Sequence, residues 1–435
     1  MRAHFGLASL AGVLSILACT AMPPAASAQA VIRQREPERW TLSFRVDIRA
    51  WQDFGSVRAK RAAEHDVWTF DNASVVVPVL ERTSTHRVDP RGLSIEVTLD
   101  DRPAPPAVAE PVRLIPGKHA GSRWGMFAMG EGMGREIRVQ MKLPMTSYAV
   151  EVDDEAAIAM EWPQGDWPAD AASALLPQMG IELDLAGEPY QGLDRAQEKV
   201  ERLLQTLGRE PREVPPYLVA KFLTAQVWRH IRNTNGNGLQ YNRLGEIEGI
   251  GLQGVPWTIS GRGRTNEFDA CSMLVYVLRQ AGLPARLVLG VIADVEFDDE
   301  DMIARDDDDE DDIICWVEFA LVERGRSVWI PIDLIGLMDR SSRAPDVSKY
   351  EELARPWKGF GTIEDSDRWA PFSHHFHPPL TVKAYGSPGF WGIFAEPTEP
   401  GRATQAITFD VTRTPTTAES QREMQQQRQR QRRSR

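Results

Sequence analysis

Along the first part of the chain, apolar and polar residues alternate with a period of two. From Trp40 to Trp51 this pattern puts four apolar side chains on one face of a strand, namely Leu42, Phe44, Val46 and Ile48. Further strands are predicted over residues 67–79, 93–99, 136–143 and 148–152, with irregular segments over residues 29–38 and 101–111. Short strands separated by Gly, Pro and Asp are typical of a β-sandwich or barrel, so we predict a β-rich, sandwich-like domain over residues 38–168.

After residue 190 the apolar residues take the spacing of helices. Residues 193–207 and 215–231 are predicted to form amphipathic helices, and residues 239–260 to be largely irregular. A third helix is predicted to start between Asn266 and Cys271 and to end near Ala281, because its apolar residues recur at helical spacing. Gly282 follows its last turn and Pro284 cannot continue it, so a tight turn is expected there.

The segments after this helix have the composition of strands. Residues 286–293 form an apolar, β-branched run that favours a strand in a core. Residues 313–322 and 327–333 are predicted to be two strands joined by a hairpin at Glu323–Arg326. The second part of the chain therefore combines helices and strands, and we predict an α+β fold for the chain.

Length and charge limit the possible functions. The 435 residues suggest two or three domains, and a net charge of −12 argues against general nucleic-acid binding. The charge is concentrated, because residues 294–312 carry thirteen carboxylates against the single Arg305. We interpret this segment as a solvated loop; calcium or a basic partner is the alternative, but no Asp-x-Asp-x-Asp-Gly sequence supports a calcium site. Residues 400–435 are predicted to be a disordered, Gln- and Arg-rich tail, which could engage the acidic segment.

The first 28 residues have the pattern of a secretory signal peptide. Arg2 precedes an apolar stretch over residues 5–18, and Ala26-Ser27-Ala28 supplies small residues for cleavage. The protein is therefore predicted to be exported, to the periplasm or outside the cell. An alternative is a lipid anchor on Cys19, which follows Leu17-Ala18. No later run approaches the roughly 20 apolar residues of a membrane-spanning helix.

Cysteines and histidines are few. If Cys19 leaves with the signal peptide, only Cys271 and Cys315 remain, so the chain is not a disulfide scaffold. A compact histidine cluster consists of His374, His375 and His377, of which the last two could bind zinc with a distant ligand. One His-x-His pair is a weak signal, and we predict neither a metal nor another cofactor. The scattered histidines are interpreted as surface or hydrogen-bonded polar residues: His65, His86 and His119.

A glycine-rich approach to a helix, a Gly-x-Pro-Ala-Arg turn and two later strands occur together in this chain. The turn is Gly282–Arg286, and the strands contain Trp316–Glu318 and Trp329–Asp333. In these features residues 195–338 resemble the transglutaminase-like superfamily, which includes secreted bacterial members and cysteine proteases of similar core. The resemblance implies that residues 190–395 form a transglutaminase-like (cysteine-protease-like) core, in which a helix cluster packs on an antiparallel sheet. A preceding β domain is common in bacterial relatives.

The family uses a Cys-His-Asp triad, and the resemblance implies where each member belongs. The nucleophilic Cys stands twelve residues before the Arg that matches Arg279, which is position 267, and this chain has Glu267 there. The His stands two residues before Trp316, where this chain has Ile314. The third position is retained as Asp333. Only the orienting carboxylate of the triad is therefore predicted to be present.

Such a substitution removes the usual chemistry. Acyl transfer needs a thiolate, formed by a paired imidazole and the positive end of the helix, and a proton returned by that imidazole. Glu267 would gain about 0.3–1 kcal/mol at the helix start but cannot replace a thiolate. We therefore predict an exported pseudoenzyme that binds a protein or peptide ligand, with a groove formed by Trp257, Glu267, Asp269, Trp316 and Asp333, where Asp269 matches the family's acidic position.

The competing hypothesis is an active cysteine acyl-transferase or peptidase that uses Cys271. This residue lies one helical turn after Glu267, and the histidine cluster could supply a base. The simpler interpretation is a buried, inert thiol. Strand alternation turns Cys315 to the face opposite Ile314, so a Cys271–Cys315 disulfide is not expected. Hydrolysis by the carboxylates of Glu267 and Asp333 ranks last, because nothing nearby favours a sugar site.

Overall fold

The computed structural model describes residues 30–50, 68–117, 120–184, 186–231, 238–242, 244–261, 265–293, 313–376, 383–384, 392–396 and 403–414. Val31–Arg435 is one compact unit. The predicted signal peptide, the acidic segment 294–312 and residues 415–435 of the predicted tail lie outside the described residues.

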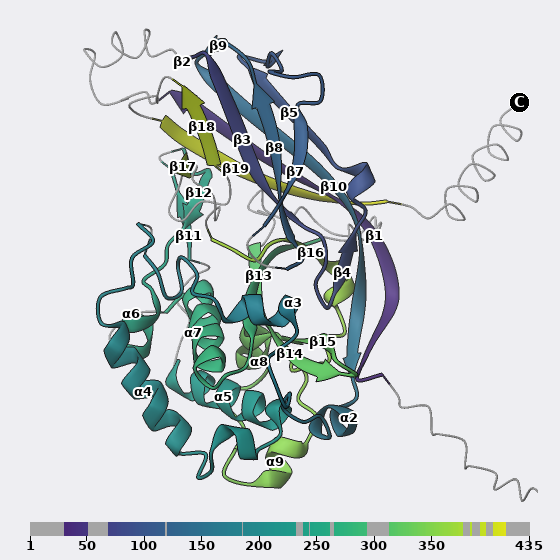
Figure 1. The fold of residues 1–435 in the computed structure, drawn as a ribbon, viewed down its shortest axis with the longest axis vertical. Helices are drawn as coiled ribbons and strands as arrows, with labels where there is room; N and C mark the ends of the chain where they lie inside the picture. Colours follow the sequence, from purple (N-terminus) through teal and green to yellow (C-terminus); the bar gives the residue numbers. More distant parts are fainter. Residues whose placement is uncertain are drawn as a thin grey trace, which may run out of the picture. The chain divides into compact units, whose positions relative to one another are not determined.

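The longest strands of the chain lie side by side in one sheet (Figure 1). At its centre, β1 (Ile32–Ala50) pairs antiparallel with β10 (Glu136–Val152) and with β19 (Ala403–Arg413). Among the described residues this sheet has eight strands, in the order β11-β12-β19-β1-β10-β5-β6, with β4 also paired to β10. The other members are β4 (His86–Val88), β5 (Ser94–Leu99), β6 (Arg102–Pro103), β11 (Leu239–Tyr241) and β12 (Ile247–Ile250).

A second sheet packs against the first. Its strands follow the order β17-β18-β3-β8-β7, and apolar side chains of both sheets, among them Phe44, Val77 and Phe127, share one core. Two sheets over one core are a sandwich, which confirms the predicted β-rich, sandwich-like region. The strands are β3 (Asn72–Leu80), β7 (Val112–Pro116), β8 (Ser122–Met129), β17 (Lys383–Ala384) and β18 (Gly392–Glu396), while β2 (Trp68–Phe70) pairs separately with β9 (Gly132–Gly134).

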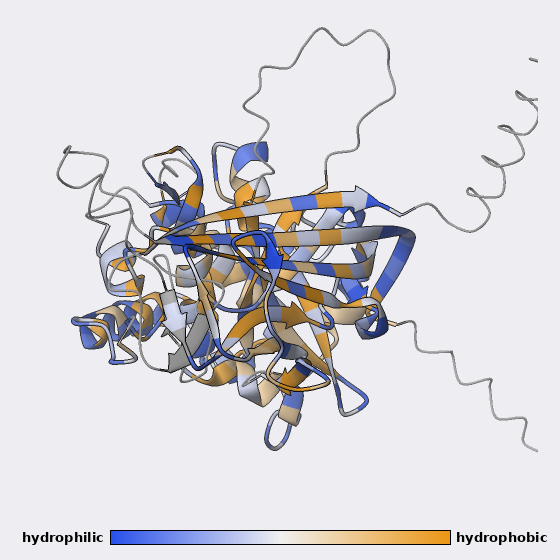
Figure 2. Ribbon diagram, turned by 90° about the horizontal axis from the view of Figure 1, so that it is seen from above, coloured by the Kyte–Doolittle hydropathy of each residue, from blue (hydrophilic) through white to orange (hydrophobic). Residues whose placement is uncertain are grey.

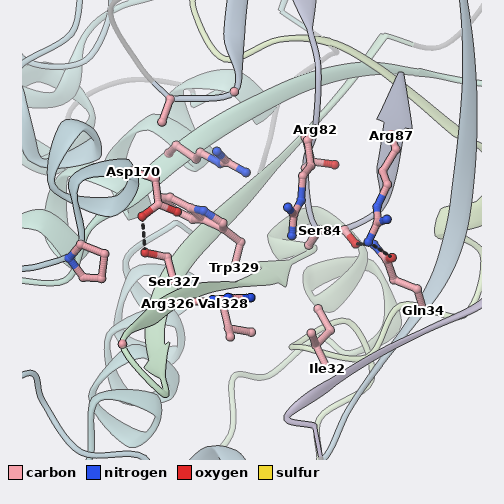
Figure 3. A pocket seen from close by; sticks show the side chains of 16 residues that line it. Ile32, Gln34, Arg82, Ser84, Arg87, Asp170, Arg326, Ser327, Val328 and Trp329 are labelled. Carbon is pink, nitrogen blue, oxygen red and sulfur yellow. Dashed lines mark hydrogen bonds between the residues drawn. The ribbon is translucent and has the colours of Figure 1, made fainter. Parts of the chain in front are cut away.

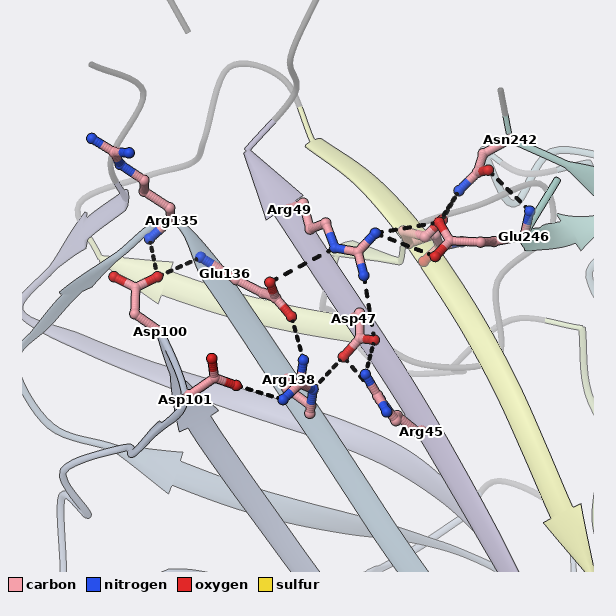
Figure 4. A network of polar contacts seen from close by, with 11 residues as sticks. Arg45, Asp47, Arg49, Asp100, Asp101, Arg135, Glu136, Arg138, Asn242 and Glu246 are labelled. Atoms are coloured by element: carbon pink, nitrogen blue, oxygen red, sulfur yellow. Dashed lines mark hydrogen bonds and ion pairs between the residues drawn. The ribbon is translucent and has the colours of Figure 1, made fainter. Parts of the chain in front are cut away.

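Alternation along the long strands separates the core from a charged outer face (Figure 2). The four apolar residues predicted for one face of β1 are all buried: Leu42, Phe44, Val46 and Ile48. On the opposite face Asp47 accepts hydrogen bonds from Arg45 at 2.5 Å and Arg138 at 2.7 Å, within a wider network (Figure 4). Burial alone would raise the pKa of Asp47, but the two arginines outweigh it and lower that pKa.

A third sheet, in the order β15-β14-β13-β16, carries the segments that the sequence assigned to the core. On one face α7 (Glu267–Gln280) packs against β13 and β14. On the other face Trp316 clusters with Leu80 of the sandwich and with Trp369. The third sheet is therefore enclosed between α7 and the β-rich region. Its strands are β13 (Ala285–Ile292), β14 (Ile313–Glu323), β15 (Arg326–Ile332) and β16 (Trp369–Ser373).

The predicted helices form close to their expected bounds. α4 (Leu193–Gln205) has a polar outer face, whereas α5 (Pro216–His230) is buried along most of its length and contacts α7. α7 stops after Gln280, and Gly282 adopts a φ of 83°, which glycine tolerates without strain. The remaining described α-helices are α2 (Asp154–Ile158), α3 (Ala169–Ala172), α6 (Val255–Ser260), α8 (Leu334–Arg340) and α9 (Tyr350–Ala354).

Several predicted boundaries differ from the structure. β1 begins at Ile32, inside the range 29–38 that was expected to be irregular. Residues 136–152 form the single strand β10 rather than two. The alternation of buried and partly buried residues continues without a break on both sides of Pro144, which itself pairs with Thr41 of β1. Residues 239–260 contain β11, β12 and α6 instead of being largely irregular.

The C-terminal part of the chain also departs from expectation. The range 400–435, predicted to be disordered, contains β19, which is hydrogen-bonded to β1 from Trp40 to Ala50. Strands β11, β12 and β17 to β19 come from beyond residue 168 and complete the two sheets of the sandwich. The predicted ranges 38–168 and 190–395 therefore do not mark separate structural units within Val31–Arg435.

Candidate functional site

A side-chain cap builds the start of α7. Asn266 precedes the helix in an extended conformation, and its Oδ1 accepts a hydrogen bond from the Asp269 N–H at 2.8 Å. Its Nδ2 donates to the Gly251 carbonyl at 2.5 Å, so the same residue also holds the preceding segment. Glu267, the first residue of the helix, is half-buried. The position predicted for the nucleophile is therefore fixed on a rigid element.

Asp269 ties α7 to the segment that enters α6. Its Oδ1 accepts from the backbone N–H groups of Gln253 at 3.0 Å and Gly254 at 3.3 Å. Within the described part of the chain, its Oδ2 is buried without a hydrogen bond. Burial raises the pKa of Asp269 to about 6, although the two backbone hydrogen bonds act to lower it. This carboxyl group positions the entrance to α6 from inside the core.

Cys271 and Cys315 meet between α7 and β14. Cys271 is fully buried, and its thiol donates to the Cys315 carbonyl oxygen, with 3.7 Å between sulfur and oxygen. Both residues are free thiols. Burial raises the pKa of the Cys315 thiol well above its usual range, as do its hydrogen bond with Cys271 and the charges of Glu267 and Asp333. The structure thus brings Cys271, Glu267 and Asp333 within electrostatic reach of Cys315.

Ile314 and Trp316 lie on the other face of β14. Trp316 is fully buried in a cluster with Leu80, and Ile314 packs against that cluster. The Trp316 ring rests on Gly290, where an added Cβ would lie 2.8 Å from the indole. The prediction that Trp316 lines a groove is therefore wrong. Because β14 alternates, Cys315 is the neighbouring residue that contacts α7.

Asp333 follows β15 and caps α8. Its Oδ1 accepts from the Gly336 N–H at 2.8 Å, and its Oδ2 lies 3.6 Å from Nη2 of Arg340. The side chain is 14% exposed, and burial is the main reason why its pKa is raised. The carboxylate predicted to orient a histidine therefore serves as a helix N-cap in this chain.

Residues of β13 and β14 form a buried link to the sandwich. Arg286 donates from Nε and Nη2 to Oε2 of Glu318, at 2.9 and 2.6 Å, across directly paired positions of β13 and β14. The other oxygen of Glu318 accepts from the backbone N–H and the hydroxyl of Ser84, at 2.8 and 2.5 Å. Glu318 is completely buried, so both of its oxygens are satisfied by residues of two different regions.

Arg279 forms a second buried ion pair. Its Nη1 donates to both carboxylate oxygens of Glu182, at 2.8 and 3.0 Å, and its Nε donates to the Ala285 carbonyl at 2.9 Å. The last contact closes the turn between α7 and β13. The residues that carried the family resemblance, Arg279 among them, therefore position the elements of the core.

Of the four histidines that the structure describes, three are buried and His230 is exposed. His374 and His375 are buried after β16, and the ring of His375 stacks against Trp124. His377, His65 and His119 lie outside the described residues. His86 is buried and bonded to Thr83 and to the Leu80 carbonyl, and burial lowers its pKa to about 3. It is a satisfied internal histidine, not a surface one.

Trp257 is the most exposed of the predicted groove residues. It lies on α6, is 50% exposed, and lines a cavity of about 450 Å³ between α4 and α6. Tyr190, Arg195 and Lys199 line the same cavity, as does Gln253, whose backbone is held by Asp269. Sequence reasoning missed the α4 side of this cavity, because only the fold brings it beside α6.

Two further properties of the described residues bear on function. No group of three or more His, Cys, Asp or Glu side chains in this part of the chain is arranged to hold a metal ion. None of the helices that the structure describes is both long and apolar enough to cross a membrane.

Comparison with known proteins identifies a family for one segment of the chain. Residues 225–334 match the family model of the transglutaminase-like superfamily, a segment that begins within α5 and ends just after Asp333. No curated protein is significantly similar to the chain. A crystal structure from Cytophaga hutchinsonii, named "a Putative Cysteine Protease", has 12% sequence identity and a TM-score of 0.45, covering 88% of this chain and 93% of that one.

The chain therefore contains a transglutaminase-like domain combined with a β-rich region. The matched segment contains the end of α5, the helices α6 and α7 and the strands β13 to β15, as predicted from the turn Gly282–Arg286 and the strands that follow. It also contains β11 and β12 of the first sheet.

Proposed function

We propose that this protein is an exported, catalytically inactive member of the transglutaminase-like class that binds protein or peptide segments. The observation that carries the proposal is the composition of the site at the start of α7. Glu267 occupies the first turn, and the nearby thiols of Cys271 and Cys315 are buried against one another. Export rests on the pattern of the first 28 residues.

The state of the two thiols supports inactivity. A nucleophilic cysteine must ionise, and it does so in exposed, electropositive surroundings. Here the neighbours of Cys315 include Glu267 and Asp333, whose negative charges oppose ionisation, and burial opposes it further. The Cys271 thiol is fully buried and donates to the Cys315 carbonyl oxygen, so its sulfur is not presented to a substrate.

The cavity between α4 and α6 supports a binding role. Trp257 and Tyr190 offer aromatic surface, and Arg195 and Lys199 offer positive charge beside it. Half-exposed aromatic residues next to arginine are typical anchors for peptide side chains. Asp269 holds Gln253 and Gly254 from below, so the cavity wall is fixed to the start of α7. A peptide would bind here, next to the former reaction site and not within it.

Alkylation of the folded protein tests this proposal. We expect iodoacetamide to leave Cys271 and Cys315 unlabelled in the native protein, and to label both after denaturation, as read by mass spectrometry of peptides. The buried position of both sulfurs is the reason. Rapid native labelling of Cys271 alone would favour the competing function, a cysteine acyl-transferase or peptidase.

A further inference from the structure

A second cavity, of about 630 Å³, lies between the sandwich and the β14–β15 hairpin. β1 contributes Gln34, the segment around β4 contributes Arg82 and Arg87, and the hairpin contributes Arg326 and Trp329. Figure 3 shows Arg82 and Arg87 descending toward the cavity from one side, with Ser327 and Trp329 on the other. The cavity is thus assembled from segments that are distant in sequence.

The walls of this cavity carry more positive than negative charge. Arg82, Arg87 and Arg326 are exposed, and none of them forms an ion pair with a carboxylate among the described residues. The acidic lining residue is Asp170, whose Oδ1 already accepts from the Ser327 hydroxyl at 2.7 Å. In a chain with a net charge of −12, a cavity wall with three arginines that have no carboxylate partner among the described residues favours an anionic ligand.

The floor of the cavity is rigid. Arg286 is buried, is neutralised by Glu318, and stacks on Trp329 with its guanidinium carbon 3.9 Å from the ring centroid. Nη2 of Arg87 lies 3.4 Å from Oε1 of Gln34, whose Nε2 donates to the Ser84 carbonyl at 2.6 Å. Guanidinium groups that are held in place lose less freedom when they bind a ligand.

We propose that this cavity binds the phosphate or sulfate group of a small anionic ligand, with Arg82, Arg87 and Arg326 as the binding residues. A tetrahedral dianion offers several oxygens at once, which suits guanidinium groups approaching from two sides. The volume exceeds that of one such group, so the remainder of the ligand lies along Trp329. This site is separate from the peptide-binding cavity between α4 and α6, and neither proposal depends on the other.

Calorimetric titration of the full chain with inorganic phosphate, inorganic sulfate and acetate tests the proposal. We expect phosphate or sulfate to bind at millimolar or lower concentration and acetate to bind more weakly, because it has one charge and two oxygens. Comparison of the two tetrahedral anions identifies the preferred source. Arg82→Gln and Arg326→Gln should each weaken binding about tenfold, the loss typical of one charge-assisted hydrogen bond, while Arg82→Lys should weaken it less.

Arg91→Gln is the matched control. Arg91 is also an exposed arginine, but it lies outside the cavity and pairs with Asp89. It should bind phosphate as the unmodified protein does. The proposal is overturned if the unmodified protein binds neither tetrahedral anion, or if Arg91→Gln loses as much affinity as Arg82→Gln. Circular dichroism spectra of all variants should match, because the substituted side chains are exposed.

Discussion

At the scale of single residues, Asp269 couples the start of α7 to pH. Its pKa is raised from 3.8 to about 6, chiefly by burial. A carboxyl group with a raised folded-state pKa binds its proton more tightly in the folded than in the unfolded protein. Folding is therefore favoured when Asp269 is protonated, and this contribution is lost as pH rises from about 4 through about 6.

Asp269→Asn should remove this dependence. Asparagine can still accept the hydrogen bonds of Gln253 and Gly254 with its carbonyl oxygen, but it never ionises. Relative to the unmodified protein, the variant should gain on the order of 1–3 kcal/mol in free energy of unfolding between pH 4 and pH 7. Urea unfolding at both pH values measures this difference. The same change at the exposed Asp166 should produce no comparable gain, and an equal gain there would contradict the assignment.

The buried pair of Arg286 and Glu318 makes a second prediction at this scale. Glu318→Gln removes the charge that compensates Arg286, and a buried ion left without its partner typically costs about 3–5 kcal/mol. We expect a loss of this size in the free energy of unfolding, measured with urea at neutral pH. Glu323→Gln, at the more exposed end of the same strand, is the control and should change stability by less than about 1 kcal/mol. Similar losses in both variants would show that the stability does not depend on the buried ion pair of Glu318 with Arg286.

The sequence identified several residues of the core correctly, but not the contacts that these residues make. The spacing singled out Arg279, Arg286 and Glu318, but their partners Glu182 and Ser84 lie far away in sequence and have no local signal. Helical and strand periodicity also could not decide which face of β14 would meet α7. That choice follows from the tertiary packing of Trp316 against the sandwich.

At the scale of elements, β19 is the part of the C-terminal region on which the sandwich depends. It pairs with β1 over eleven positions, from Trp40 with Arg413 to Ala50 with Ala403. Its inward residues Ile407 and Phe409 belong to the core. Loss of this strand would expose an edge of β1 and apolar surface together.

Two truncations separate β19 from the residues that follow. A chain that ends after Thr414 keeps β19 and should retain the melting temperature of the full chain within a few degrees. A chain that ends after residue 402 lacks the strand, and we expect it to be insoluble or to melt at least 10 °C lower in a thermal scan. Each kcal/mol of lost stability lowers the melting temperature by about 2–4 °C, and the loss of a whole core strand costs several kcal/mol. Equal melting temperatures for the two truncations would contradict the role of β19.

Alternation of apolar and polar residues was sufficient to predict most strands. It failed for β19, where the polar and basic composition of the C-terminal region suggested disorder instead. Ile407, Phe409 and Val411 alternate with polar residues, which is a strand signal. Polar and basic composition after this segment obscured it. Helices were predicted to within a few residues, since the cap at Asn266 and the turn at Gly282 are local signals.

At the scale of the whole molecule, the transglutaminase-like domain and the sandwich are built into one another. The third sheet is covered by α7 on one side and by residues such as Leu80 on the other. β12 extends the first sheet through β19, and Ser84 bonds Glu318 in the core. Sequence patterns cannot reveal that the two regions share sheets and contacts, because the pairing partners come from distant parts of the chain.

The proposed function requires that the site at the start of α7 does not perform cysteine chemistry. Its most direct test is turnover by the full chain of glutamine-donor peptides with a primary amine, and of peptide libraries, read by mass spectrometry. Cys271→Ser, with its fold checked by circular dichroism, is the matched variant. We predict no product above the level of this variant, because the first turn of α7 carries Glu267 instead of a cysteine. The Cys271 thiol is buried and bonded to the Cys315 carbonyl oxygen. Turnover by the unmodified protein that is abolished by Cys271→Ser would show that Cys271 is catalytic and would contradict the proposed inactivity.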